Sequence, residues 1–170
     1  MSSQVTFLKL GISLRTYMAN SLEKFLKEQI PLSGAMEVKI LSATSEGVEI
    51  FAPLKPNINH VGTAFGGSLH AILLLSCYAW FLTAVEKLNE KTSAKRKFHI
   101  LLKSSSTEYL LPVTSDIKAI CKSPPKADLD KFYEAFSKKG KGRLNITAEV
   151  TTDAGIACKL VGEFVAVAAK

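Results

Sequence analysis

Two adjacent glycines stand where a polar loop passes into a long apolar segment. Gly66 and Gly67 follow residues 56–65, and residues 69–85 then continue without Asp, Glu, Lys or Arg. Glycine lets a ligand approach the backbone closely, and the first amides of a helix have no partner within that helix. The pattern is typical of a site that binds a phosphate or polarises a carbonyl, although close packing of helix on strand would use the same glycines.

Polar side chains come before and after this segment. Asn57, Asn59 and His60 lie in the preceding loop, where they either orient a substrate or a water molecule or brace the loop itself. Ser104 and Ser106 lie in a run of hydroxyl side chains inside an apolar stretch. Alternation along a strand would put these two on one face, where they either face a substrate or bond to backbone.

Positive charge is concentrated in one part of the chain. Lys and Arg number 22 against 15 Asp and Glu, and residues 91–145 hold 13 of the former against 5 of the latter. The run Lys95, Arg96 and Lys97 lies in this segment and indicates either contact with an anion or a solvated, soluble surface. No nucleic-acid motif or interleaving of aromatic side chains accompanies it, so we do not expect a nucleic-acid partner.

The remaining candidate side chains favour a structural role. Cys77, Cys121 and Cys158 are far apart, without the spacing of a zinc site, so we expect no metal and a reducing, cytoplasmic setting. His70, Cys77 and Tyr78 fall within the apolar segment, where core or interface positions are the expected interpretation.

The elements that must position these residues are predicted by hydrophobic periodicity. Residues 13–30 show the spacing of an amphipathic helix that Pro31 ends, and strands are expected at 36–40 and 48–52. The apolar segment predicts a helix from Gly66 to about Leu88. Strands are then expected at 98–111, 115–121, 143–151 and 156–168, with a short helix around 129–136 between the second and the third.

This order predicts one α+β domain over residues 1–170, with its core at about 35–168. Strands joined by hairpins imply an antiparallel sheet of five or six strands, curved around one long helix. Residues 69–85 reach the lower limit of a membrane span, but the surrounding strand patterns favour a buried core helix, so no membrane span is expected.

The same residues resemble a known family. Pro56-Asn57, the string Gly62-Thr-Ala-Phe-Gly-Gly-Ser-Leu69 and the later Tyr109-Leu-Leu-Pro-Val113 are similar to the hot-dog fold of acyl-CoA thioesterases, and to the YiiD C-terminal type among them. The resemblance covers roughly residues 30–168. It implies a homodimer or a dimer of dimers, a Gly amide that polarises the thioester carbonyl, and an Asn or His that orients substrate or water.

Carried onto this chain, the resemblance implies an oxyanion site at Gly66 and Gly67, with the loop polar group among Asn57, Asn59 and His60. Two positions depart from the family pattern. Phe65 replaces the His that precedes the glycines in many relatives, and Leu74 stands where an Asp is expected on the helix. No Asp or Glu occurs between Glu49 and Glu86, so the usual carboxylate is missing.

These expectations combine into a hypothesis and two alternatives. The chain is expected to hydrolyse an acyl-CoA or related thioester, a small-molecule partner, without a cofactor other than the coenzyme A of the substrate. Its phosphates would bind at Lys95, Arg96 and Lys97. A non-catalytic acyl-CoA binder is the first alternative, because the carboxylate is missing. A hot-dog dehydratase or hydratase is the second, although its usual loop patterns are not seen.

Overall fold

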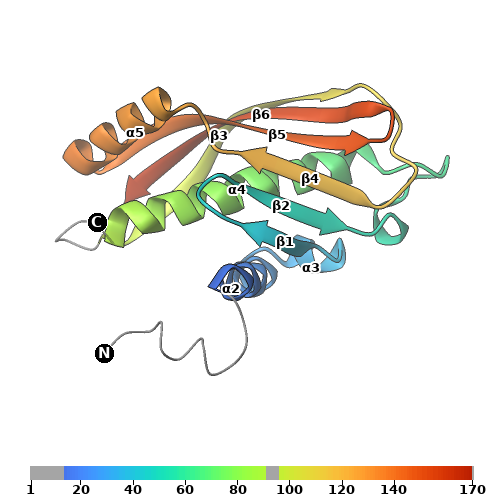
Figure 1. Cartoon of the computed structure of the whole chain (residues 1–170), viewed down its shortest axis with the longest axis horizontal. Helices are drawn as coiled ribbons and strands as arrows, with labels where there is room; N and C mark the ends of the chain where they lie inside the picture. The colour runs from blue at the N-terminus through green and yellow to red at the C-terminus, as the bar shows by residue number, and fades with distance from the viewer. Residues whose placement is uncertain (1–13, 91–95, 170) are drawn as a thin grey trace.

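The computed structural model describes residues 14–90 and 96–169 (Figure 1). Its helices are α2 (Leu14–Gln29), α3 (Pro31–Ala35), the 3-10 turn η1 (Lys55–Asn57), α4 (Gly66–Glu90) and α5 (Lys126–Lys139). Its strands are β1 (Lys39–Ala43), β2 (Gly47–Ala52), β3 (Phe98–Tyr109), β4 (Ile117–Lys122), β5 (Lys141–Thr152) and β6 (Gly155–Ala168).

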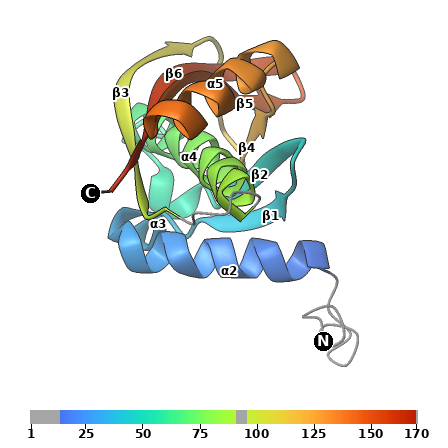
Figure 2. The same ribbon diagram turned by 90° about the vertical axis from the view of Figure 1, so that its left-hand side faces the viewer.

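One curved antiparallel sheet holds all six strands, in the order β1-β2-β4-β5-β6-β3. Seen nearly along the axis of α4, the sheet curls around this helix, with β3 at one edge and β1 near α2 (Figure 2). The predicted α+β arrangement of a sheet around one long helix is therefore confirmed. The register matters for the site, because it decides which side chains of β3 face α4.

The core forms between α4 and the concave face of the sheet. The Phe81 ring lies 5.0 Å from the ring centre of Phe132 on α5 and 6.1 Å from that of Phe164 on β6. By length and composition α4 is long and apolar enough to cross a membrane, yet 61% of its most apolar window is buried inside the fold. The apolar segment is the core helix that the sequence predicts.

The two edges of the sheet differ. Helix α2 packs along β1, and its Glu23 carboxylate accepts a hydrogen bond from the Ile40 amide at 2.9 Å. The buried side chain of Leu26 lies on the same helix. At the other edge β3 pairs with β6 alone, and nine of its twelve residues are exposed. Only the β3 edge is open among the described strands.

The structure differs from the sequence prediction around Pro31. The first helix ends at Gln29, but the chain forms the short helix α3 before β1, because Pro is tolerated in the first turn of a helix. The Met36 amide bonds back to the Leu32 carbonyl at 3.0 Å, which keeps Met36 out of the strand. Consequently β1 begins at Lys39 instead of the predicted residue 36.

Candidate active site

The start of α4 presents backbone amides that the helix itself does not use. The Phe65 carbonyl accepts a hydrogen bond from the Leu69 amide at 3.0 Å. The amides of Gly66, Gly67 and Ser68 therefore precede the first bond of the helix. No acidic side chain in this turn neutralises the positive end of the helix dipole. The dipole can therefore stabilise a partial negative charge on a bound oxygen.

Asn57 holds the loop that leads to this helix. Its side chain is only 1% exposed, and its Nδ2 donates to the carbonyls of Met36 at 3.0 Å and Pro53 at 2.8 Å. Its own carbonyl accepts from the Phe65 amide at 2.7 Å, just before the helix begins. These bonds hold the loop in place. Because both hydrogens of the Asn57 side-chain amide are used, none remains to bind a substrate.

Asn59 and His60 lie in a tight turn further along the same loop. The Asn59 Oδ1 accepts from the amides of Val61 at 3.0 Å and Thr63 at 3.2 Å, and its Nδ2 donates to the Thr63 hydroxyl at 2.8 Å. Gly62, with φ of +85°, allows the chain to reverse here. His60 is exposed in this turn. The Asn59 side chain is therefore hydrogen-bonded within the turn, and His60 is exposed to solvent.

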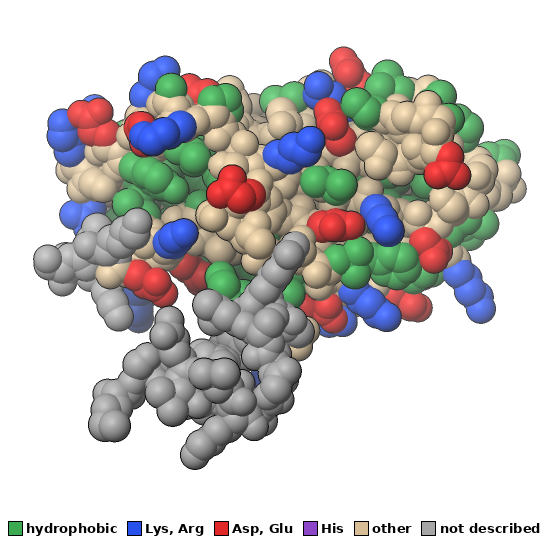
Figure 3. Space-filling model, viewed as in Figure 1, with side chains coloured by type: hydrophobic (Ala, Val, Ile, Leu, Met, Phe, Trp, Pro, Cys, Tyr) green, Lys and Arg blue, Asp and Glu red, His purple; other side chains and the backbone are tan. Residues whose placement is uncertain are grey.

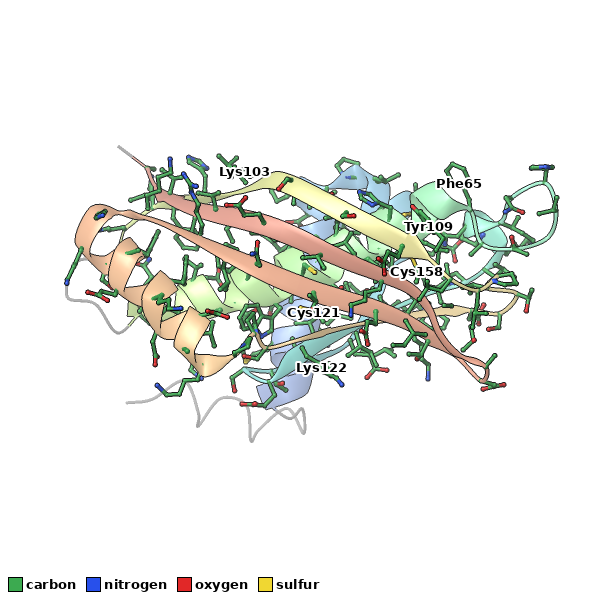
Figure 4. The ribbon with its side chains drawn as sticks, turned by 90° about the horizontal axis from the view of Figure 1, so that it is seen from above. Phe65, Lys103, Tyr109, Cys121, Lys122 and Cys158 are labelled. Atoms are coloured by element: carbon green, nitrogen blue, oxygen red, sulfur yellow. The ribbon has the colours of Figure 1, made fainter. Side chains whose placement is uncertain are left out.

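Two aromatic rings flank the two glycines. The Tyr109 hydroxyl donates to the Gly66 carbonyl at 3.0 Å, and a Cβ on Gly66 would lie 3.4 Å from the Tyr109 ring. The Phe65 ring covers Gly67, where a Cβ would come within 2.9 Å of the ring's Cζ. Both rings are about half exposed at the same end of the molecule (Figure 4). Partial burial, followed by the nearby Cys158, raises the pKa of Tyr109, so its hydroxyl remains a donor at neutral pH.

A shallow apolar groove of about 370 Å³ opens beside Tyr109 at the start of α4. It brings together the end of the loop, the first turn of α4 and the segment that follows β3; its lining residues are Ala64, Gly66, Leu69, Tyr109, Leu110, Leu111, Pro112 and Val113. The Ala64 amide donates to the Val113 carbonyl at 2.7 Å and ties these segments together. Such walls suit an apolar chain whose polar end lies at the helix start.

His70, for which the sequence predicts a core or interface position, contacts β3 next to this site. The His70 Nδ1 is 2.7 Å from the Thr107 hydroxyl of β3, and both side chains are half-buried. His70 stands one helical turn beyond Gly66 and therefore on the same face of α4. In the sequence, the i, i+4 spacing from Gly66 is the signal that could have indicated His70. Its contact with Thr107 on β3 becomes evident only from the fold.

The register of β3 separates the predicted serines from the helix. Ser104 lies opposite Glu163 and Ser106 opposite the exposed Val161, so both side chains are on the outer face of the sheet. Ser105 and Thr107 lie on the inner face instead, Thr107 opposite the buried Leu160. The bulge between Leu102 and Ser104 sets this alternation.

The predicted phosphate-binding residues lie at the other end of α4. Arg96 and Lys97 are exposed where the chain enters β3, and Lys95 is outside the described residues. On the face shown in Figure 3, basic and acidic side chains are interspersed. On α5, for example, Lys138 pairs with Glu134 at 2.6 Å. Within one subunit, the structure does not bring Arg96 and Lys97 to Gly66.

The carboxylates that α4 itself carries are remote from the helix start. The acidic side chains of α4 are Glu86 and Glu90, in its last turns. In residues 14–90 and 96–169, no three His, Cys, Asp or Glu side chains gather as a metal site would require. Cys77, Cys121 and Cys158 are all free and buried.

The fold is that of the hot-dog class, with unpaired backbone amides at the start of the central helix. Residues 19–168 match the YiiD_C family, described as "Putative thioesterase (yiiD_Cterm)", and the chain belongs to this family. No curated protein is similar enough to count as a match.

Several solved structures are similar to this chain. A protein of unknown function from Chlorobaculum tepidum is 28% identical with a TM-score of 0.77, covering 88% of this chain and 93% of its own. A "putative thioesterase" from Shewanella oneidensis is 26% identical with a TM-score of 0.76, covering 89% and 98%. A probable thioesterase from Pseudomonas aeruginosa, at 18% identity, TM-score 0.70 and coverage of 88% and 96%, supports the fold alone.

Proposed function

We propose that the protein hydrolyses an acyl thioester carried by coenzyme A, with the carbonyl oxygen bound by the first-turn amides at Gly66 and Gly67. The observation that carries this proposal is the free amide group at the start of α4 beside an apolar groove. The amides would stabilise charge that develops on the oxygen, and the groove would hold the acyl chain or the pantetheine arm.

In this mechanism a water molecule attacks the carbonyl carbon, and the carbonyl π electrons move to the oxygen that the amides hold. The intermediate then expels the coenzyme A thiolate, leaving a carboxylic acid. We assign His70 as the base that accepts the proton of the water. If its Nδ1–H donates to Thr107, its Nε2 has a free lone pair for that proton.

The open β3 edge supports a homodimer for the working protein. An unpaired strand offers a row of backbone donors and acceptors to a second copy. Leu101 on this strand is 56% exposed, and the half-buried side chains of Ala71, Leu74 and Tyr78 follow one face of α4. Three buried, unpaired thiols support a reducing compartment such as the cytoplasm.

A non-catalytic acyl-CoA binder is the second candidate. Its support is that α4 has no carboxylate near its start, since Glu86 and Glu90 lie at its far end. The amides and the groove would still bind a thioester in such a protein, while water would lack a carboxylate base. The two candidates share a binding site and differ in turnover.

Thiol release from a panel of acyl-CoA thioesters, with the melting temperature measured in parallel, separates the candidates. Release supports the hydrolase, a melting-temperature rise without release supports the binder, and neither response contradicts both. His70→Asn tests the base, because Asn can still bond to Thr107 but cannot take the proton. For the hydrolase we expect at least about a hundredfold lower kcat with little change in KM. Unchanged kcat would exclude His70 as the base.

A further inference from the structure

The first peptide group of α4 links a carbonyl that is bonded within the protein to an amide of the proposed oxyanion site. The Gly66 carbonyl and the Gly67 amide belong to one conjugated, planar unit. Hydrogen bonds in series polarise one another, so a donor to the carbonyl oxygen makes the N–H of the same unit a stronger donor. A contact at the Gly66 carbonyl therefore acts on the Gly67 amide as well.

Tyr109 makes such a contact. Its hydroxyl donates to the Gly66 carbonyl oxygen at 3.0 Å. Gly66 is the first residue of α4, and in a helix the carbonyl at this position is the acceptor for the amide four residues on. A carbonyl oxygen has two lone pairs, so the Tyr109 hydroxyl adds a second donor to the one that the helix supplies. The peptide group between Gly66 and Gly67 is thus polarised from its carbonyl side.

The backbone around Tyr109 fixes the position of its side chain. Tyr109 is the last residue of β3, which pairs with β6 along its length. The amides of the next two residues, Leu110 and Leu111, donate to the Ala157 carbonyl at 2.8 and 3.1 Å. The ring itself packs on Gly66, because a Cβ there would lie 3.4 Å from a ring carbon. The sheet and the packing of the ring together keep the hydroxyl on the Gly66 carbonyl.

We infer that Tyr109 positions and polarises the peptide group whose amide, that of Gly67, binds the thioester oxygen. The inference rests on the proposed function and adds a positioning residue that acts through the backbone. As negative charge grows on the bound oxygen, its hydrogen bond from a polarised amide strengthens. The stabilisation is therefore larger in the transition state than in the bound substrate, and Tyr109 should affect kcat more than KM.

The first test removes the hydroxyl and keeps the ring, because Tyr109 also lines the apolar groove. For Tyr109→Phe we expect kcat for acyl-CoA hydrolysis at least about fivefold lower, with KM within about twofold of wild type. Tyr133→Phe is the matched control, since it removes a hydroxyl from α5, away from the groove, and should leave kcat within about twofold. Equal kcat values for the two variants would overturn the inference.

A second test strengthens the donor instead of removing it. Tyr109 is replaced by tyrosines that carry fluorine on one or on both of the ring carbons next to the hydroxyl. Each fluorine makes the phenol more acidic and its O–H a stronger donor, while the ring changes little in size. At a pH low enough to keep every phenol protonated, kcat should rise with each fluorine. A kcat that stays constant or falls along the series would contradict polarisation of the Gly67 amide.

Proton resonances of the backbone amides test the inference without turnover. The Gly67 amide proton should move upfield in Tyr109→Phe and downfield in the fluorinated proteins, because its peptide group loses or gains polarisation. The Gly66 amide belongs to the preceding peptide group and should move much less. An aromatic ring remains at position 109 throughout, so its ring current changes little. Equal shifts at Gly66 and Gly67, or none at Gly67, would count against the inference.

Failure of the proposed function gives a different result from failure of this inference. If the wild-type protein turns over no acyl-CoA, hydrolysis is excluded, while a Gly67 resonance that follows the Tyr109 substitutions still supports the polarised peptide group. If the wild-type protein hydrolyses the thioester and neither kcat nor the Gly67 resonance responds to Tyr109→Phe, hydrolysis stands and the inference is wrong.

Discussion

The two glycines at the start of α4 have different surroundings, although they are neighbours in sequence. A Cβ at Gly66 would meet the Tyr109 ring at 3.4 Å, an ordinary contact distance, whereas at Gly67 it would run into the Phe65 ring. A methyl group at Gly67 must therefore displace the Phe65 ring. Gly66 can accept a methyl group with little movement.

We expect Gly67→Ala to lower kcat/KM for thioester hydrolysis at least about tenfold, because the displaced Phe65 ring would disturb the proposed oxyanion site. Gly66→Ala is the matched control and should stay within about threefold of wild type. Steady-state kinetics with one acyl-CoA provides the comparison. Equal losses in both variants would mean that the position of the Phe65 ring does not matter.

We expect Asn57 to contribute to the stability of the fold and not to the chemistry. Asn57→Ala removes two side-chain hydrogen bonds and leaves the carbonyls of Met36 and Pro53 without this donor, so the free energy of unfolding should fall by about 2–4 kcal/mol. Urea unfolding measures this loss. Asn59→Ala, in an exposed turn, is the control and should cost less than about 1 kcal/mol. An Asn57→Ala protein with full stability but no activity would assign Asn57 to the chemistry.

The buried thiols should resist modification in the folded protein. Burial raises the pKa of Cys158 to about 11, so at pH 8 only about one thiol in a thousand is ionised. A hydrogen bond with Cys77 and then burial raise the pKa of Cys121. A thiol reagent at pH 8 should label no cysteine within the time that labels all three in urea. Rapid labelling of the native protein would show that the core opens.

At the scale of elements, hydrophobic periodicity predicts most of the helices and strands. The apolar segment, the alternating residues of β5 and the stripe on α5 each reflect one buried face, which local sequence records directly. Helix α3 was missed because Pro31 marks a helix start as readily as a helix end. The bulge at Lys103 was also missed, and with it the face on which Ser104 and Ser106 lie.

The candidate site was predictable only where it depends on backbone. The paired glycines located the helix start, because their chemistry needs no partner from elsewhere in the chain. The roles of Asn57 and His70 depend on contacts with Met36 and Thr107, which are 21 and 37 residues away. Such contacts are set by the curvature and register of the sheet, which a single sequence does not encode locally.

Strand β2 lies so close to β4 that its first residue has no room for a side chain. A Cβ on Gly47 would lie 2.5 Å from the Cys121 carbonyl oxygen, a backbone atom that cannot move alone. We expect Gly47→Ala to lower the free energy of unfolding by about 1–3 kcal/mol. Gly34→Ala, on α3 with nothing within 4 Å, should be neutral or stabilising by up to about 1 kcal/mol. Thermal or urea unfolding of both variants checks the contrast.

At the scale of the whole molecule, the proposed dimer makes activity depend on the β3 edge. Leu101→Glu/Leu102→Glu places two charges beside the proposed pairing, and we expect a monomer with at least about tenfold lower kcat/KM. Sedimentation velocity and kinetics measure the two effects together. The control is Leu32→Glu, an equally exposed leucine on α3. A wild-type protein that is monomeric and fully active would contradict the proposed dimer.

The cover of α2 over β1 limits how copies of this protein can join. A sheet with two open edges can add strands at both ends and grow without limit, as fibres do. Here α2 covers the β1 edge, and its Glu23 carboxylate accepts a hydrogen bond from the Ile40 amide. Growth through strand pairing therefore stops after a single addition. Helix α2, which lies ahead of the sheet in the sequence, therefore limits strand addition at the β1 edge.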